Sequence, residues 1–346
     1  MSKSQKNLFA LPDPDLAHIL HHASRDLEQF RGKKIFITGG TGFFGKWLLG
    51  GLCHANDEMA LGLHLTVLSR NPAGFLRQFP FAGEVPALDF LRGDVASFSA
   101  DHRAFDFILH AASDTTAFTS DADERERSRA IVAGTRRILE LAQQSRAQRF
   151  LYVSSGAVYG NLAGKVEGAS EDDYDLATPL IPYATAKREA EQLCAESGVD
   201  FTTARAFAFL GPYLALDAHF AAGNFLRDAR RGGPILVRGD GTALRSYLYP
   251  ADLVIWLLRV LLRGKKGRAY NVGSGEVVST AQLARKIAES LTPQPEVVIQ
   301  SVQPQGPQNI YLPDISRAQN ELGLQVMIPL QEAIARTHAF LDTNAI

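Results

Sequence analysis

Cysteine is scarce in this chain, and neither sign of charge is in excess. Only Cys53 and Cys194 occur among the 346 residues, far apart in the sequence, so neither a disulfide framework nor a set of zinc ligands is visible. Lysine and arginine together number 36 against 37 acidic residues, which gives a net charge of −1 and argues against nucleic acid as a partner. We expect a globular protein of the cytoplasm that binds no metal.

Long hydrophobic runs are also lacking. The first residues contain no continuous apolar stretch and no small-residue cleavage site of the kind that directs export. The most apolar run, residues 253–262, is interrupted by Arg259 and is too short to cross a bilayer. We therefore expect no membrane association and interpret this run as a buried helix.

The order of the apolar patterns predicts an α/β fold. Residues 1–31 show helical spacing after two early prolines and are predicted to form an N-terminal helical extension. From residue 33 onward, short β-branched and aromatic runs alternate with longer amphipathic stretches, which is typical of βαβ units with a parallel sheet covered on both faces. The expected strands are 34–38, 65–69, 89–94, 106–110, 149–155, 200–206 and 268–273, and the expected helices are 44–55, 123–146, 183–197, 280–290 and 329–341.

A glycine-rich turn follows the first of these strands. Glycines stand at positions 39, 42 and 45, directly before a helical pattern that begins at Lys46. Glycine at such places allows a tight turn, a backbone that touches a pyrophosphate, and close packing of helix on strand. This context predicts a dinucleotide site of the Rossmann type, and a glycine-rich turn without a ligand is the alternative. The residues expected at the phosphates are Gly39, Thr41, Gly42, Phe43, Phe44 and Gly45.

The end of the second strand predicts which dinucleotide binds. An acidic residue at this place would bond the ribose 2′-hydroxyl of NAD(H), but the sequence has Ser69, Arg70 and Asn71. A guanidinium can instead neutralise a 2′-phosphate, so we predict NADP(H) in preference to NAD(H); the alternative is that Arg70 faces solvent. Other cofactor contacts are expected at the ends of neighbouring strands, from Asp94, Val95, Ala111, Ala112, Ser113, Val153 and Phe207.

A tyrosine and a lysine four residues apart give the strongest catalytic signal. Tyr183 and Lys187 begin a predicted helix, in which side chains at i and i+4 share a face. A free phenol has a pKa of about 10 and is a poor base at neutral pH, but a fixed ammonium nearby stabilises the phenolate. Ser155 ends the fifth strand, at the carboxyl edge of the sheet where open α/β folds bind ligands.

These motifs, in this order, resemble the extended short-chain dehydrogenase/reductase family, in its nucleotide-sugar epimerase/dehydratase branch. The resemblance extends from about Lys33 to Leu341. It implies a Rossmann-type doubly wound parallel sheet with a smaller C-terminal substrate-binding lobe. Further matches to the family lie at 211–212, 239–245, 249–252, 271–275 and 314–318. The domains that we predict are an NADP-binding domain of residues 32–206, with returning segments near 235–275, and a substrate-binding lobe of residues 207–234 and 276–346.

The resemblance also implies roles for single residues. Tyr183 is the expected general base or acid for a sugar hydroxyl, Lys187 tunes it and holds the nicotinamide ribose, and Ser155 bonds the reacting oxygen. Arg245 matches an arginine that meets the substrate diphosphate, and a role in tying the lobe together is the alternative. A nucleotide sugar is therefore the expected substrate. A homodimer formed through the helices after the fourth and fifth strands is the expected assembly.

The sequence departs from the family's 4,6-dehydratases at two positions. Those enzymes carry Asp-Glu directly after the hydroxyl residue, where this chain has Gly156 and Ala157. Neither residue transfers a proton, so dehydration of that kind is disfavoured. Small residues there resemble epimerases, decarboxylases and ketoreductases, and Gly156 is expected to leave room for the sugar.

The remaining substrate contacts are expected from loops and from the lobe. Many relatives place an asparagine that touches the substrate near Ala208, and its loss puts the standard diphosphate pose in doubt. Asn224 or His219 could compensate, or could be structural. Asp114 and Thr115, on the loop after the fourth strand, could face the sugar, with Asp114 either as an extra acid/base or as a capping residue.

These observations predict an NADP(H)-dependent 4-ketoreductase or 4-epimerase that acts on a nucleotide-activated sugar. The alternatives within the family are a dehydratase and a decarboxylase. A reductase of a non-sugar carbonyl and a non-catalytic NADP-sensing protein are alternatives of other kinds. The complete set of Ser155, Tyr183 and Lys187 argues against a sensor, because a sensor needs no stabilised phenolate.

Overall fold

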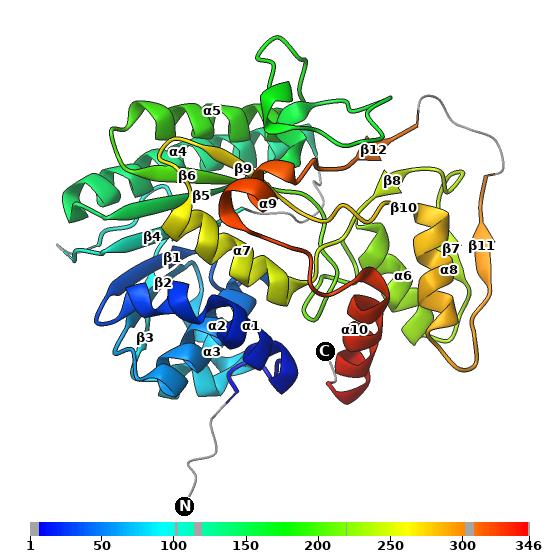
Figure 1. The fold of residues 1–346 in the computed structure, drawn as a ribbon, viewed down its shortest axis with the longest axis horizontal. Coiled ribbons are helices and arrows are strands. Elements are labelled where there is room, and N and C mark those ends of the chain that lie inside the picture. The colour runs from blue at the N-terminus through cyan, green and yellow to red at the C-terminus, as the bar shows by residue number, and fades with distance from the viewer. Residues whose placement is uncertain (1–6, 101–102, 114–119, 219, 302–307, 345–346) are drawn as a thin grey trace, which may run out of the picture.

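A seven-stranded parallel sheet forms the centre of the larger part of the molecule (Figure 1). The computed structural model describes residues 7–100, 103–113, 120–218, 220–301 and 308–344. All neighbouring strands run parallel, and the order reverses between β1 and β4, the place where such sheets bind ligands. This is the doubly wound sheet that the sequence predicts. Its strands in order are β3 (Leu88–Arg92), β2 (His64–Ser69), β1 (Lys34–Thr38), β4 (Phe107–His110), β5 (Arg149–Ser155), β6 (Phe201–Ala206) and β9 (Ala269–Val272).

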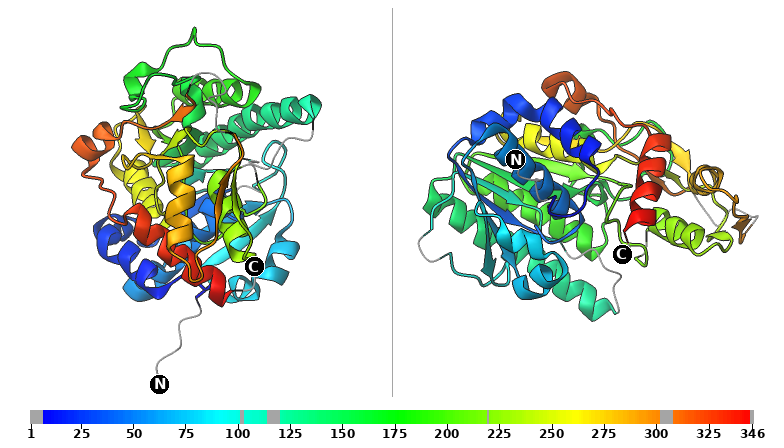
Figure 2. Two further views of the ribbon diagram at one scale, coloured as in Figure 1. Left: turned by 90° about the vertical axis from the view of Figure 1, so that its right-hand side faces the viewer. Right: turned by 90° about the horizontal axis from the view of Figure 1, so that it is seen from below.

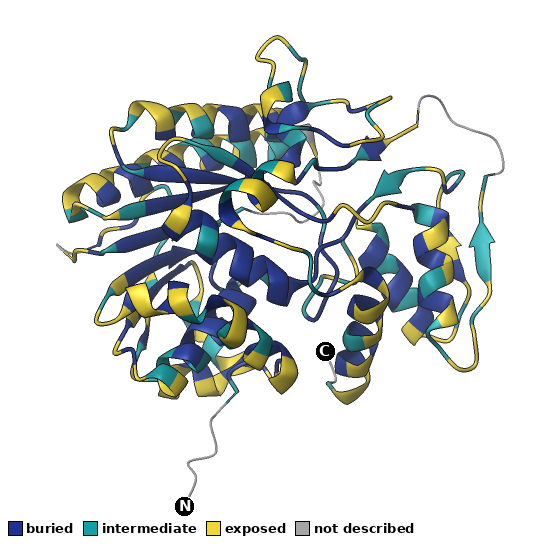
Figure 3. Cartoon of the chain, viewed as in Figure 1, coloured by how far each residue is buried: buried dark blue, intermediate teal, exposed yellow. Residues whose placement is uncertain are grey.

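Helices cover both faces of this sheet (Figure 2). Ile35 and Ile37 of β1 belong to the hydrophobic cluster beneath one pair of helices, whereas Phe36 between them belongs to the cluster beneath the other pair. Because helices cover both faces, the central strands are buried along nearly their whole length (Figure 3), and their sequences are mainly apolar. The first pair is α2 (Phe43–Met59) and α7 (Pro250–Arg263), and the second is α4 (Asp121–Ser145) and α5 (Pro182–Glu196).

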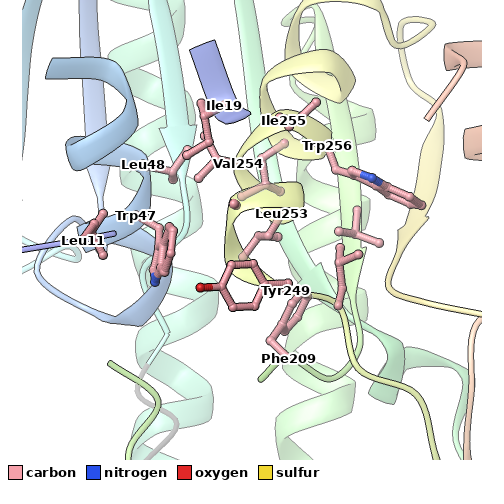
Figure 4. Packing of buried hydrophobic residues seen from close by; sticks show 14 of the residues in the cluster. Leu11, Ile19, Trp47, Leu48, Phe209, Tyr249, Leu253, Val254, Ile255 and Trp256 are labelled. Atoms are coloured by element: carbon pink, nitrogen blue, oxygen red, sulfur yellow. The ribbon is translucent and has the colours of Figure 1, made fainter. Parts of the chain in front are cut away.

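Helix α7 is buried on nearly all sides, which explains its apolar sequence. Val254 lies in the core on the side of α7 that faces Leu48 of α2, whereas Trp256 lies on the opposite side (Figure 4) and donates to the Gln325 carbonyl at 3.1 Å. Helix α1 (Asp13–Leu27) packs along α7 and α2. Arg259, the polar interruption of the run, donates to the Asp26 carboxylate of α1 at 3.2 Å. The predicted buried helix is confirmed. Within the described ranges, no helix is both long and apolar enough to span a bilayer.

A second group of elements lies beside the carboxyl edge of the sheet, and we call it the small lobe (Figure 1). It holds two small sheets, one with the order β11–β7 and one with the order β10–β8–β12. In the second sheet, Tyr311 pairs with Arg245 in a parallel ladder. The small lobe consists of α6 (Ala221–Arg230), β7 (Ile235–Val237), β8 (Leu244–Arg245), β10 (Val278–Ser279), α8 (Thr280–Glu289), β11 (Val297–Ile299), β12 (Ile310–Tyr311) and α10 (Leu330–Thr343).

The segment 235–275 divides between the two parts of the molecule. Its strands β7 and β8 pair within the small lobe, whereas its helix α7 and strand β9 belong to the large sheet and its covering layer. The domain boundaries proposed from the sequence stay a prediction. The other short elements are η1 (Glu28–Phe30), α3 (Pro72–Gln78), η2 (Pro80–Glu84), η3 (Gly156–Tyr159), η4 (Glu171–Asp173) and α9 (Ser316–Leu322).

Candidate active site

The glycine-rich turn joins β1 to α2 at the carboxyl edge of the sheet. Gly39 has a φ of +74°, and a Cβ there would lie 2.6 Å from the carbonyl oxygen of Ala111, so only glycine fits between the two strand ends. The amide of Gly42 donates to the Gly39 carbonyl at 3.0 Å, and α2 begins at Phe43. Because Gly42 offers no side chain to cap the helix, its first amide groups are available to an anion.

A buried histidine fixes the end of β4 next to this turn. The Thr135 hydroxyl donates to the Ile131 carbonyl at 2.8 Å and lies 3.1 Å from His110 Nε2, so Nε2 carries the imidazole proton. His110 Nδ1 then accepts from Thr38, 2.7 Å away. Burial, assisted by the charge of Lys187, lowers the pKa of His110 to about 3. The neutral ring thus orients Thr38, whose oxygen accepts from the Ala112 amide at 3.1 Å.

The end of β2 carries the residues that predict the dinucleotide. The Asn71 side chain accepts from the Gly74 amide at 3.0 Å and begins α3. Its own amide donates to Ser69 Oγ at 3.3 Å, so both side chains shape the turn. Arg70 is exposed, and the β2–β3 ladder places Arg92 level with Ser69. Two guanidinium groups therefore stand at adjacent strand ends.

The third strand end is shaped mainly by Asp94. Its side chain accepts from the Ala96 amide at 2.9 Å, which closes the turn after β3, and Val95 reaches the cluster beneath α4 and α5.

The edge of the sheet fits a dinucleotide. The Ser113 hydroxyl, just beyond β4, is buried and has no hydrogen-bond partner among the described residues. A buried polar atom without a partner is rare, and a ligand across this edge would supply one. Together with the free amides of α2 and the narrow gap at Gly39, this supports the dinucleotide assignment. The predicted contacts of single residues with the cofactor stay predictions.

Tyr183 and Lys187 lie on the first turns of α5, as their spacing predicts. Pro182 opens the helix, and the Lys187 ammonium lies 5.9 Å from the centre of the Tyr183 ring. Lys187 is almost fully buried and donates to the Val153 carbonyl at 2.9 Å, which ties α5 to β5. Burial lowers the pKa of Lys187, while the charge of Tyr183 acts in the opposite direction. The ammonium is thus a fixed charge beside the phenol.

Ser155, at the end of β5, shares its hydroxyl with a second tyrosine. Its Oγ accepts from the Ala157 amide at 3.2 Å and lies 3.2 Å from the hydroxyl of Tyr311. Burial above all, together with the charge of Tyr183, raises the pKa of Tyr311 above its ordinary value. Ser155, Tyr183 and Tyr311 therefore belong to one site, and Tyr311 remains a phenol at neutral pH.

The position after Ser155 is closed by an aromatic cluster. A Cβ on Gly156 would lie 2.6 Å from the ring of Phe207. That ring packs 4.9 Å from the Tyr311 ring and 6.1 Å from the Tyr159 ring, measured between centres. Phe207, predicted as a cofactor contact, is buried in this cluster.

Arg245 stands above the same cluster, on the small lobe. Its guanidinium donates to the side chain and the carbonyl of Asn309, at 3.0 and 3.1 Å, and lies 5.8 Å from the centre of the Tyr311 ring. Burial lowers the pKa of Arg245. Asn224, in contrast, accepts from Arg227 at 3.0 Å within α6. Asp114, Thr115 and His219, also predicted near the substrate, lie outside the described residues.

A polar network joins α5, β6, β9 and η3 beneath the site. Arg205 of β6 pairs with Glu191 of α5 at 2.8 Å and donates to the Tyr159 hydroxyl at 2.9 Å. Tyr159 in turn donates to Asn271 of β9 at 2.7 Å. The backbone amide of Asn271 donates to the Glu171 carboxylate at 2.7 Å. All of these groups are paired and all but the half-buried Glu191 are buried, so the network holds these elements together.

Sequence reasoning missed Tyr311 and Asn309. Both lie in a proline- and glutamine-rich segment that lacks periodicity, and the two-residue strand β12 is too short to give a pattern. The signal that could have found Tyr311 is a single aromatic residue beside Ile310 in that polar segment.

The doubly wound sheet, the glycine turn and the paired tyrosine and lysine define the class of the short-chain dehydrogenases/reductases. The model of the NAD dependent epimerase/dehydratase family matches residues 35–273. The chain is 27% identical to a dTDP-glucose 4,6-dehydratase of Streptomyces niveus, over 90% of this chain and 93% of that protein. It is 28% identical to UDP-glucuronic acid decarboxylase 1 of Xenopus tropicalis, over 88% of this chain and 71% of that protein.

A solved structure has the same fold. The structure of an epimerase of Methanothermobacter thermautotrophicus superposes with a TM-score of 0.79 and 24% identity, covering 94% of this chain and 96% of that one. The chain belongs to the NAD-dependent epimerase/dehydratase family and is an enzyme of the extended short-chain dehydrogenase/reductase type.

Proposed function

We propose that this enzyme interconverts an alcohol and a ketone at C4 of a nucleoside-diphosphate sugar, as a ketoreductase or an epimerase. The observation that carries the proposal is the Tyr183–Lys187 pair beside Ser155, with the Lys187 ammonium buried and held by the Val153 carbonyl. The names of the relatives, which act on dTDP-glucose or UDP-glucuronic acid, support the substrate class. The half-buried guanidinium of Arg245 supports a diphosphate on the small lobe.

In the oxidative direction, Tyr183 takes the proton of the sugar hydroxyl as the C–H bond of the same carbon breaks. The nicotinamide, when bound, supplies the chemistry of hydride transfer. Lys187 donates one hydrogen bond to Val153 and keeps two donors for the phenolate and the ribose. In the reductive direction, Tyr183 returns the proton, and Ser155 donates to the developing oxyanion.

The surroundings of Ser155 favour chemistry at a single carbon. Gly156 and Ala157 carry no group that transfers a proton, and the Phe207 ring occupies the space that a longer side chain at 156 would need. Elimination of water with a protein acid and base is therefore disfavoured. Decarboxylation is the second candidate, supported by the decarboxylase relative. A carboxylate on the carbon next to a new C4 ketone leaves as CO2, its bonding electron pair passes to the ketone as an enolate, and the enolate then needs only one proton at C5, from Tyr183 or water.

The proposed cofactor preference is NADP(H) over NAD(H). The end of β2 carries Ser69 and Arg70 where an acidic residue would bond a 2′-hydroxyl. Arg92, level with Ser69 on β3, adds a second positive charge at this edge. A 2′-phosphate would be stabilised by both charges.

The test of the proposal is Tyr183→Phe, which removes only the hydroxyl. We expect turnover to fall by about 10²- to 10⁴-fold, with NADPH affinity and the melting temperature preserved. Conversion of UDP-glucose, dTDP-glucose and a UDP-4-keto sugar is measured by chromatography. Near-normal turnover in the variant would remove the proposed role.

The same assay separates the two reactions. Stoichiometric oxidation of NADPH with the keto sugar identifies a ketoreductase. Isomerisation of the nucleotide sugar without added cofactor identifies an epimerase.

A further inference from the structure

Tyr311 brings a second phenol to the reacting group from the small lobe. Its hydroxyl lies 3.2 Å from Ser155 Oγ and donates to the Ala206 carbonyl at 3.3 Å. Tyr311 and Ser155 lie 156 positions apart in the chain. The two-residue strand β12 thus places this hydroxyl within hydrogen-bond distance of Ser155, the residue proposed to bond the reacting oxygen.

The number of protons limits what Ser155 can do. A hydroxyl has one proton to donate, and the Ala206 carbonyl can only accept. If Tyr311 donates to Ala206, then Ser155 donates to Tyr311 and has no proton left for a third oxygen. If Tyr311 donates to Ser155 instead, the Ser155 proton is free for the substrate. The distances from the Tyr311 hydroxyl to Ser155 Oγ and to the Ala206 oxygen both exceed the usual 2.7–2.8 Å of such bonds. Neither hydrogen bond is therefore strong enough to hold the Tyr311 proton in one place.

We propose that Tyr311 is a positioning residue that turns its proton from Ala206 to Ser155 when substrate binds, and so makes Ser155 a donor to the reacting oxygen. This inference rests on the proposed function of Ser155. The hydrogen bond from Tyr311 polarises the Ser155 hydroxyl, and a polarised donor stabilises the developing oxyanion more strongly.

Tyr311 serves as a donor and not as a second base. Its hydroxyl is buried, and burial raises its pKa above the ordinary value of 10, so it keeps its proton throughout the working range of pH. Among the described residues, its hydroxyl bonds Ser155 and the Ala206 carbonyl, and it bonds no Lys or Arg side chain. Tyr183, by contrast, has the Lys187 ammonium beside it.

The ring and the hydroxyl of Tyr311 have separate effects. The ring lies beneath the Arg245 guanidinium, 5.8 Å from its centre, and packs on Phe207. The hydroxyl alone reaches Ser155. Tyr311→Phe keeps the ring and therefore the support of Arg245, so we expect kcat to change and KM to stay within about twofold.

The test is a double-mutant cycle of Tyr311→Phe and Ser155→Ala. We expect Tyr311→Phe to lower kcat about tenfold in the wild-type background, as the loss of one hydrogen bond would. In the Ser155→Ala background it is expected to have less than about a twofold effect, because Tyr311 acts through Ser155. The wild-type to Tyr311→Phe ratio is expected to stay constant from about pH 6 to 9, since Tyr311 does not titrate there.

Tyr159→Phe is the matched control. It removes a buried hydroxyl from the same aromatic cluster, but that hydroxyl bonds Asn271 and Arg205 rather than Ser155. Its effect on kcat is expected to be equal in both backgrounds. Melting temperature and NADPH binding verify that each variant folds.

The outcomes separate this inference from the proposed function. The probes are UDP-glucose, dTDP-glucose and UDP-glucuronic acid, each with NADP⁺ or NAD⁺, and a UDP-4-keto sugar with NADPH or NADH. If the wild-type enzyme converts none of them, the proposed function fails and this inference fails with it. If the wild type converts one and Tyr311→Phe is equally fast, or is equally impaired with and without Ser155, the inference alone is overturned.

Discussion

Arg70 is the residue on which the cofactor preference depends. Arg70→Ala is expected to weaken NADPH binding by about 10- to 100-fold, the loss of a charge-assisted hydrogen bond, and to leave NADH binding unchanged. Fluorescence titration with both nucleotides measures the ratio. Arg77→Ala is the control, because Arg77 is exposed at the far end of α3. An unchanged ratio in Arg70→Ala would show that the assignment of NADP(H) is wrong.

His110 makes the folded state sensitive to acid. Its pKa in the folded chain is about 3 because it is buried, whereas the unfolded chain binds the proton near 6.5. The contribution of neutral His110 to the free energy of unfolding is therefore fully present above pH 6.5. It decreases by about 1.4 kcal/mol per pH unit as the pH falls toward 3. Urea unfolding at pH 7 and pH 5 is expected to show this loss in the wild type and a flatter profile in His110→Gln.

The control for this pH effect is His64→Gln. His64 is exposed at the start of β2, so its substitution is expected to leave the acid sensitivity as it is. Parallel profiles for the wild type and His110→Gln would contradict the explanation.

Single residues of the site were predictable where their chemistry is local. The tyrosine and lysine are four residues apart on one helix, and the glycine turn lies within seven positions, so short-range rules identify both. Tyr311 could not be found in this way, because its partner Ser155 is distant in the sequence and its strand has two residues. The packing of Phe207 against Gly156 is likewise a contact between separate strands.

At the scale of elements, helix α1 is a part of the core. Ile19 is fully buried between α2 and α7 (Figure 4). The buried Asp15 carboxylate accepts from Tyr249, the residue directly before α7, at 2.6 Å and pairs with Arg336 of α10. The sequence predicted a helical extension without a role. The structure shows that this helix connects α7 with the small lobe.

Ile19→Ala is expected to lower the free energy of unfolding by about 2–4 kcal/mol, because the cavity lies between three helices. Leu20→Ala, at the neighbouring half-buried position, is expected to cost about 1 kcal/mol. Urea denaturation measures both variants. If both variants lower the free energy of unfolding equally and only slightly, α1 does not contribute to the stability of the core.

The long helices and the sheet strands followed the sequence pattern closely, because each is buried on a face whose period is visible locally. Helix α2 runs to Met59, one turn beyond its predicted end. Helices α3, α6 and α9 and the strands of the small lobe were missed. They are short, and residues such as Leu244 and Ile310, which pair across the sheet, give no period of their own.

At the scale of the whole molecule, the two parts each provide half of the proposed site. The large sheet provides Ser155, its covering helix α5 provides Tyr183 and Lys187, and the small lobe provides Arg245 and Tyr311 on one two-stranded ladder. The large sheet is thus proposed to hold the dinucleotide and the small lobe the diphosphate of the sugar. The homodimer through α4 and α5, and the cytoplasmic location, stay predictions.

The most direct test follows the hydride itself. NADPH that carries deuterium at the reactive face of nicotinamide C4 is incubated with UDP-4-keto-6-deoxyglucose, and the sugar product is analysed by mass spectrometry. The wild-type enzyme is expected to give an alcohol with one deuterium at C4, and Tyr183→Phe is expected to give almost none in the same time. An alcohol without deuterium, or equal transfer by both enzymes, would contradict hydride transfer with Tyr183 as the acid.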